Sequence, residues 1–177
     1  MPLLDELERP TLLVNPDIAR QNIAFMADKA RLQGIRFRPH FKTHQSAVVG
    51  EWFRAVDVTA ITVSSVDMAL YFADHGWDDI TVAFPVNIRQ MRAINSLAWR
   101  IRLGLLVESL ESLQYLQNQL ETPVDIWLKI DSGSGRTGLA WDAPTAISRL
   151  AQAVSQSDKT RLRGLLTHAG RTYSSNS

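Results

Sequence analysis

The chain of 177 residues contains no cysteine. Disulfide bonds, thiolate metal sites and cysteine nucleophiles are therefore excluded within it. It also lacks an excess of charge of either sign, since 19 lysines and arginines stand against 18 aspartates and glutamates. Proteins that bind nucleic acid or membrane surfaces carry clustered basic charge, so we expect neither partner. The absence of cysteine favours a cytoplasmic location.

Long apolar runs are missing as well. The run GLLV at 104–107 is typical of the longest ones, far below the roughly 20 residues that a membrane-spanning helix needs. The N-terminal stretch MPLLDELERPTLLV has early acidic residues and no basic start before an apolar core, so it is not a signal peptide. With 45% hydrophobic and 21% charged residues, the composition predicts a soluble globular protein with one sizeable core.

What the sequence does contain is an alternation of short apolar segments with segments of helical spacing. Strands are predicted at residues 35–38, 58–63, 79–84, 101–107, 124–130 and 162–167, with a short strand at 11–14 ahead of them. Helices are predicted at residues 16–31, 47–56, 87–97 and 144–155, from a cap at Ser64 or Ser65 to about Asp74, and after a cap at Ser109.

The order of these elements predicts an α/β fold with a parallel sheet and crossover helices. An open doubly wound sheet and a TIM barrel both fit this order. A complete (β/α)8 barrel takes about 250 residues. The sequence reaches a sixth predicted strand before the polar stretch RTYSSNS, and no linker or repeat marks a second domain. Residues 1–177 are therefore predicted to form one domain.

Residues that can do chemistry follow several predicted strands, where both parallel architectures place their ligands. In RPHFKTHQS, residues 38–46, Arg38, His40, Lys42 and His44 occupy alternate positions and would share one face of a strand. Such a face is either a solvated basic edge or the floor of an anion-binding, nucleophilic site. Lys42 is then a candidate for Schiff-base chemistry, which buried or cation-flanked lysines perform.

Two further strand ends are candidates. The loop DSGSGRTG, residues 131–138, has glycines around Arg136 but lacks the lysine of a P-loop, so a phosphate cradle and a plain tight loop both remain open. His168 is either a base or ring-stacking residue or a hydrogen-bonded structural histidine. His40 and His44 are four residues apart but not on a helix as in HExxH, so no metal site is assigned.

Taken together, RPHFKTHQS, KIDSGSGRTGL and GLLTHAGRTY resemble the D-threonine aldolase and D-serine dehydratase-like family, in this order and on these predicted strands. That family belongs to the fold-type III pyridoxal-phosphate (PLP) enzymes, together with alanine racemase. RPHFKTH is the specific part, because alanine racemase and the small PLP-homeostasis proteins carry different residues around their lysine. The resemblance implies a TIM-type barrel of the alanine racemase N-terminal type, incomplete here at about six βα units.

The resemblance implies roles for individual residues. Lys42 matches the lysine that holds PLP as a Schiff base and then serves as a general base, and Arg136 matches the arginine beside the phenolic oxygen of the cofactor. His168 matches the histidine near the ring face, a catalytic and cofactor-binding position, and Tyr173 matches a tyrosine close to the phosphate.

The same resemblance implies that His40 and Thr43, which flank the lysine, shape the cofactor site. The implied reaction is that of a PLP-dependent lyase on D-β-hydroxy amino acids, with PLP as the electron sink. Our first expectation is an aldolase that cleaves the substrate to glycine and an aldehyde. The alternatives are a D-serine dehydratase-like ammonia-lyase, which loses the hydroxyl as water, and a non-catalytic PLP-binding or remnant protein.

The family also implies parts that we do not find in this sequence. Relatives run to about twice this length, with a complete barrel and a C-terminal β-domain whose residues hold a divalent metal, Mn or Zn. We therefore expect the metal ligands to lie outside residues 1–177 and a homodimer in the full-length form. We also expect little or no turnover by the 177-residue chain alone.

Overall fold

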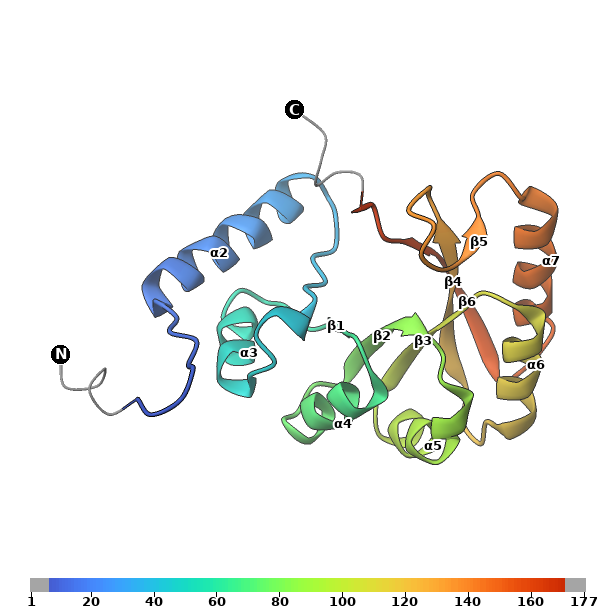
Figure 1. The fold of residues 1–177 in the computed structure, drawn as a ribbon, viewed down its shortest axis with the longest axis horizontal. Helices are drawn as coiled ribbons and strands as arrows, with labels where there is room; N and C mark the ends of the chain where they lie inside the picture. The colour runs from blue at the N-terminus through green and yellow to red at the C-terminus, as the bar shows by residue number, and fades with distance from the viewer. Residues whose placement is uncertain (1–6, 171–177) are drawn as a thin grey trace.

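The computed structural model of the protein describes residues 7–170 and has a curved parallel sheet at its centre (Figure 1). Its strands are β1 Ile61–Val63, β2 Asp79–Pro85, β3 Arg102–Val107, β4 Val124–Asp131, β5 Leu139–Ala140 and β6 Thr160–Thr167. Strands β1 to β4 are neighbours in chain order, and every strand pairing within residues 7–170 is parallel. β4 also pairs with β6, and the short β5 pairs with Ile130 and Asp131, the last two residues of β4.

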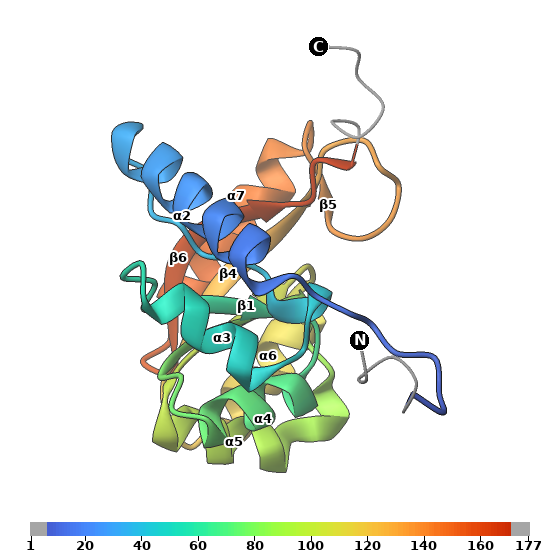
Figure 2. The ribbon, with the colours of Figure 1, turned by 90° about the vertical axis from the view of Figure 1, so that its left-hand side faces the viewer.

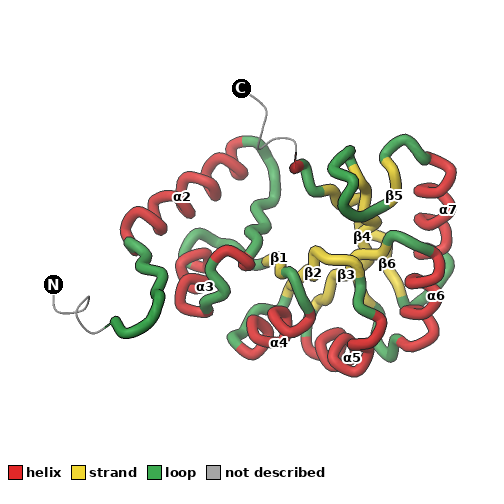
Figure 3. The backbone as a smooth tube through the Cα atoms, in the orientation of Figure 1, coloured by secondary structure: helices red, strands yellow, loops and turns green. Residues whose placement is uncertain are grey.

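The helices follow the strands as crossover connections. They are α2 Pro16–Leu32, α3 Ala47–Arg54, α4 Val66–Asp74, α5 Met91–Arg100, α6 Leu110–Gln119 and α7 Pro144–Ser155, with 3-10 turns η1 Phe41–Thr43 and η2 Ile88–Gln90. Helices α4 to α7 run along the outer side of the sheet (Figure 3), while α2 and α3 pack together near β1 (Figure 2). Within residues 7–170 this is the predicted α/β barrel, still open between β1 and β6.

Serine side chains begin three of these helices. The hydroxyls of Ser46, Ser65 and Ser109 each accept a hydrogen bond from the backbone amide three residues further on. Each bond satisfies an N–H group that would otherwise lack a partner at the helix start. The predicted caps are thereby confirmed at Ser109 and, of the two alternatives for α4, at Ser65. Pro144 stands at the first turn of α7, where its missing N–H costs nothing.

The core lies between the sheet and the outer helices. β3 is buried along its whole length after Arg102, and in β4 only two of eight residues are partly exposed. Such continuously buried strands are typical of parallel sheets that are covered on both faces. Near β1, the fully buried rings of Phe41, Phe72 and Trp77 pack edge to face, with Phe41 centroids 4.9 and 5.1 Å from the other two.

Two predicted strands are absent, and here the prediction was wrong. Residues 11–14 form no pairing, and residues 35–38 run extended beside β1 without a ladder. The backbone just after this second segment meets β1 through the isolated parallel bridge between His40 and Thr62, with a bond of 2.9 Å from the Thr62 amide to the Pro39 carbonyl. Proline has no N–H to donate, so the segment cannot complete a ladder at that position.

Other boundaries shift by a few residues. The predicted strand 58–63 is paired only as Ile61–Val63, and the strand predicted at 162–167 begins at Thr160. The predicted helix 87–97 is divided into the turn η2 and helix α5, because the Asn87 side chain caps a separate short turn by accepting from the Arg89 amide. Within the described part of the chain, no helix is long and apolar enough to cross a membrane.

The centre of β4 offers a test of this packing. Ile126 is fully buried, so Ile126→Ala is expected to lower the free energy of unfolding by about 2–5 kcal/mol through lost burial and a residual cavity. Urea denaturation followed by circular dichroism would measure the loss. The same change at Ile35, which is 64% exposed, should alter stability by no more than about 0.5 kcal/mol. Equal losses at both positions would contradict the core described here.

Candidate active site

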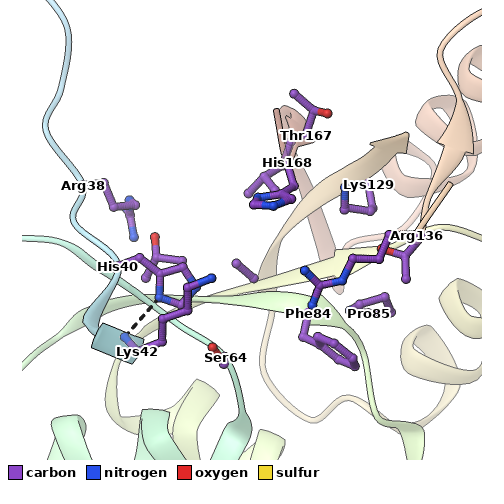
Figure 4. A pocket seen from close by; sticks show the side chains of 14 residues that line it. Arg38, His40, Lys42, Ser64, Phe84, Pro85, Lys129, Arg136, Thr167 and His168 are labelled. Carbon is purple, nitrogen blue, oxygen red and sulfur yellow. Dashed lines mark hydrogen bonds between the residues drawn. The ribbon is translucent and has the colours of Figure 1, made fainter. Parts of the chain in front are cut away.

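A cavity of about 260 Å³ opens at the C-terminal ends of the strands (Figure 4). It brings together four residues that the sequence singled out, from three distant segments: His40, Lys42, Arg136 and His168. Hydroxyl and aromatic groups complete the lining, among them Ser64, Phe84 and Thr167. In Figure 4, His40 and Lys42 enter from the η1 side, while Arg136 and Lys129 face them from the side of β4. The site thus lies where parallel α/β folds place their ligands.

The turn η1 carries Lys42. Phe41, one residue earlier, is fully buried and fixes the turn to the aromatic core, while Lys42 itself is exposed toward the cavity. The Nδ1 atom of His40 accepts a hydrogen bond from the Lys42 amide at 3.3 Å, and the Thr43 hydroxyl donates to the His40 carbonyl at 3.5 Å. Thr43 does not line the cavity, so its place is that of a residue that shapes the turn.

The side chain of Arg38 fastens this turn to the sheet. Its Nη1 atom donates to the Ile61 carbonyl at 3.0 Å and to the Thr81 hydroxyl at 3.1 Å, and its Nη2 atom donates to Asp79 at 2.6 Å. Arg38 is therefore bonded to β1 and β2 at once. Charge-assisted bonds of this kind are short and strong, and they stand in for the backbone ladder that residues 35–38 lack.

His40 is neutral at the cavity wall. Burial and the charge of Lys42 lower the pKa of His40 to about 4. Since Nδ1 accepts the bond from the Lys42 amide, the neutral ring carries its hydrogen on Nε2. His40 is thus a hydrogen-bond donor beside Lys42 without adding a second positive charge to the site.

The prediction that Arg38, His40, Lys42 and His44 share one face holds for the first three, which line the cavity, and is wrong for His44. Residues 41–43 coil as a 3-10 turn, so the period of two that a strand would impose does not hold. His44 turns away from the cavity into the aromatic cluster, 4.5 Å from the Phe41 ring centroid and stacked on Phe53 at 5.8 Å. Its Nδ1 atom accepts from the Ser46 amide, and burial lowers its pKa. His44 is a structural residue.

The loop after β4 is organised by the carboxylate of Asp131. Its two oxygens accept backbone N–H groups from Gly133, Ser134 and Gly135 at 2.8–2.9 Å, and the Ser134 hydroxyl at 3.1 Å. Desolvation alone would raise the pKa of Asp131, but these bonds outweigh it and hold the pKa below its ordinary value. Because the amides point at Asp131, they do not form a phosphate cradle. The loop is a tight loop that presents Arg136 to the cavity.

Two further contacts close the loop against the sheet. The Ser132 hydroxyl lies 2.8 Å from the Thr167 hydroxyl at the end of β6. Gly138 has φ +113°, and a side chain there would place its Cβ 2.8 Å from the Lys129 carbonyl oxygen. Only glycine fits this return toward β4. Arg136 and His168, on neighbouring segments, are thereby held on the same side of the cavity (Figure 4).

Lys129 is a residue that the sequence reasoning did not single out. It lies in β4, is 6% exposed and lines the cavity, with Nζ donating to the Ile130 carbonyl at 3.0 Å. Desolvation lowers its pKa, although Asp131 and Glu108 oppose that shift. A single lysine within the apolar run VDIWLKI was the signal available. Tyr173, by contrast, lies outside the described residues and stays a prediction.

The similarity of this chain to known proteins identifies its family. Residues 14–176 match the family model described as "Alanine racemase, N-terminal domain". The chain belongs to the alanine racemase N-terminal domain family. A solved structure of D-threo-3-hydroxyaspartate dehydratase from Delftia sp. HT23 superposes with a TM-score of 0.89 over 97% of the chain, at 29% sequence identity. A solved structure of D-threonine aldolase from Filomicrobium marinum superposes with a TM-score of 0.84 over 92% of the chain, at 26% identity.

Curated members of the wider group agree in sequence. The D-threo-3-hydroxyaspartate dehydratase of Delftia sp. (strain HT23) is 31% identical over 94% of the chain, and a 3-hydroxy-D-aspartate aldolase of Paracoccus denitrificans is 26% identical over 94%. The chain spans 45% and 44% of these two proteins, so it covers about half of their length. The resemblance to the D-threonine aldolase and D-serine dehydratase-like group, and the incomplete alanine racemase-type barrel, are confirmed.

Within residues 7–170, no group of three or more His, Asp or Glu side chains is placed to hold a metal ion.

The environment of His40 gives a pH prediction. Since its pKa is about 4 in the folded protein and 6.5 as a free side chain, the unfolded chain binds more protons between these values. The free energy of unfolding is therefore expected to fall as the pH drops from 6.5 toward 4, and the loss from this group is complete below 4. Histidine NMR resonances would follow the titration. A His40 midpoint near 6.5 would contradict the burial described here.

The Asp131 loop gives a second test. Asp131→Ala removes the acceptor of the Gly133, Ser134 and Gly135 amides, so hydrogen exchange at these three amides should accelerate by at least about tenfold at neutral pH while the core stays protected. Asp142→Ala, in the next exposed turn, is the matched control and should leave their exchange unchanged. Unaltered protection after Asp131→Ala would show that the carboxylate does not order the loop.

Proposed function

We propose that this chain carries the PLP-binding site of a PLP-dependent lyase that acts on D-β-hydroxy amino acids. The observation that carries the proposal is the meeting of Lys42, His40, Arg136 and His168 in one cavity at the carboxyl ends of the strands. The family relationship supports it, because named relatives act on such substrates: a D-threo-3-hydroxyaspartate dehydratase, a 3-hydroxy-D-aspartate aldolase and a D-threonine aldolase.

The side chains of the cavity fit PLP in chemical terms. Lys42 provides a primary amine that is exposed toward the cavity and can bond covalently to an aldehyde. Arg136 provides a permanent cation for the anionic phenolic oxygen, and His168 an imidazole for the ring face. Ser64 and Thr167 add hydroxyl donors. We propose Tyr173, outside the described residues, as a further contact near the phosphate.

When bound, PLP would supply an electron sink that makes bonds at the substrate Cα easier to break. The residues of this chain would then hold and move protons. We assign Lys42 the role of general base, and His40, which is neutral and accepts a hydrogen bond from the Lys42 amide, would not add a second cation beside it. His168, across the cavity, is the second group placed to take up or return a proton (Figure 4).

Within this class we propose an aldolase first. A base takes the proton of the β-hydroxyl, the Cα–Cβ bond breaks, and Cα takes up a proton, so that the products are glycine and an aldehyde. The alternative is a dehydratase of the D-serine dehydratase kind, in which a base takes the Cα proton and the β-hydroxyl gains a proton and leaves as water. The 31% identity to a dehydratase favours keeping this alternative. Both reactions use the same cavity and the same two proton-transfer residues.

The rest of the proposal concerns the whole protein. We propose that residues 1–177 are a partial PLP-binding barrel domain and that a β-domain and a divalent metal ion, Mn or Zn, belong to the full-length enzyme. We further propose a cytoplasmic homodimer whose small-molecule substrate at this site is the D-amino acid, with neither nucleic acid nor membrane as a partner.

Cofactor capture tests the proposal most directly. Adding PLP to the purified chain should produce a visible absorbance band, and borohydride reduction should leave a phosphopyridoxyl label on Lys42. Lys42→Ala is expected to lower the label roughly tenfold or more, because it removes the amine in the cavity. Lys29→Ala, which removes an exposed amine on α2, is the matched control and should not change it.

The position of the label decides the result. Labelling that follows Lys42 supports the proposed site, and turnover of D-threonine or D-serine by the full-length protein then separates aldolase from dehydratase. Labelling of Lys129, or scattered labelling of surface lysines that Lys42→Ala does not reduce, would refute the assignment of Lys42.

A further inference from the structure

A second cavity lies at the opposite ends of the same strands. Its volume is also about 260 Å³, and it is enclosed by residues near the starts of β2, β3, β4 and β6 together with the segment before η1. Its charged residues are the arginines at 36, 38, 102 and 163 and the aspartates at 79 and 125. Neither the proposed cofactor site nor the proposed lyase chemistry uses this cavity.

The aspartates are shared among the arginines. Asp79 binds Arg38 at 2.6 Å and Arg36 at 3.1 Å, and it lies 3.8 Å from Arg102. Both carboxylates are mostly buried, with side chains 14% and 8% exposed at Asp79 and Asp125. Buried carboxylates that contact three cations each have no remaining capacity to neutralise further positive charge.

The second carboxylate is used in the same way. Asp125 binds Arg102 at 2.7 Å through one oxygen, which also lies 3.4 Å from Arg163, and binds Arg161 at 3.3 Å through the other. These bonds raise the pKa of Arg102, which stays charged. Among the lining residues, four guanidinium groups therefore face two carboxylates, an excess of two positive charges before Arg161 is counted.

The arginines retain hydrogen-bond donors. A guanidinium carries five N–H groups. Arg163 reaches Asp125 only through Nε, and within residues 7–170 no other ion pair or hydrogen bond of its side chain occurs, so its terminal amino groups are available. Among the contacts of the described residues, Arg36 uses only Nη2, on Asp79. Thr62 and Thr81 add hydroxyls to the same cavity.

We propose that this cavity is a binding site for a small multivalent oxyanion, a phosphate or a di- or tricarboxylate. Planar guanidinium groups bind such oxygens in pairs, with bonds about twice as strong as neutral ones. An anion of charge two would neutralise the excess, and the partly enclosed cavity limits screening by solvent. Inorganic phosphate and citrate represent the two sources of this chemistry.

The site is distinct from the cofactor cavity, although they share Arg38, Thr62 and Leu166 as lining residues. Phosphate could also enter the cofactor cavity, where Arg136 and Lys42 are cationic. A test must therefore separate the two places, and substitutions that remove charge from one cavity only can do so.

Calorimetric titration of the purified chain with inorganic phosphate, and separately with citrate, at low ionic strength tests the proposal. One binding event is expected, weakening as salt is added. Arg36→Gln with Arg163→Gln should lower the affinity by about tenfold or more, because both lose charged donors. Arg149→Gln, an exposed arginine on α7, is the matched control and should have no effect. Lys42→Ala should leave the event intact, which makes this test independent of the proposed cofactor site.

NMR of the unaltered protein keeps the test decisive if the double variant does not fold. Phosphate should shift the Nε–H signals of Arg102 and Arg163 and leave that of Arg149 in place. The relative response to phosphate and citrate then identifies the preferred source. The proposal is overturned if neither anion binds, or if binding is lost with Lys42→Ala and unchanged in the folded double variant.

Discussion

The hydrogen bonds of Arg38 are the constraint on which the candidate site depends. The residue that matters for chemistry, Lys42, lies on a segment that joins the sheet through one isolated bridge. A backbone ladder would fix such a segment residue by residue, but here three bonds from one guanidinium to β1 and β2 do so. Asp79, which holds the charge of Arg38, is itself 14% exposed. The bonds of Arg38 to β1 and β2 thus fix the position of the segment that carries Lys42.

The other half of the candidate site is also ordered by one ionised side chain, but this side chain is an anion where Arg38 is a cation. There a carboxylate, Asp131, gathers the amides of the loop that follows it, and the loop then presents Arg136. Each half therefore uses one ionised side chain to give shape to irregular backbone beside the sheet. The cationic residues of the cavity therefore come from distant parts of the chain, on irregular segments that are each anchored next to the sheet.

The sequence predicted best where one physical signal was dominant. The strands around 79–84, 101–107 and 124–130 were found almost to the residue, because strands covered on both faces are continuous apolar runs. The failures have local causes. Residues 35–38 have strand-like composition but precede a proline, and His44 was placed by a strand period in a segment that coils as a 3-10 turn. No sequence rule shows that a side chain such as that of Arg38 replaces a ladder.

Lys129, which the sequence analysis missed, belongs to a row of alternating side chains along β4. In β4, the positions that alternate with the helix-facing apolar residues are Asp125, Trp127, Lys129 and Asp131. The first two line the arginine cavity, the third lines the cofactor cavity, and the fourth shapes the loop above it. One strand thus joins two polar sites through a single row of side chains. A charge in the middle of that row is costly to bury unless it has partners, so its presence in an apolar run marks the interior of a barrel more specifically than the apolar residues around it.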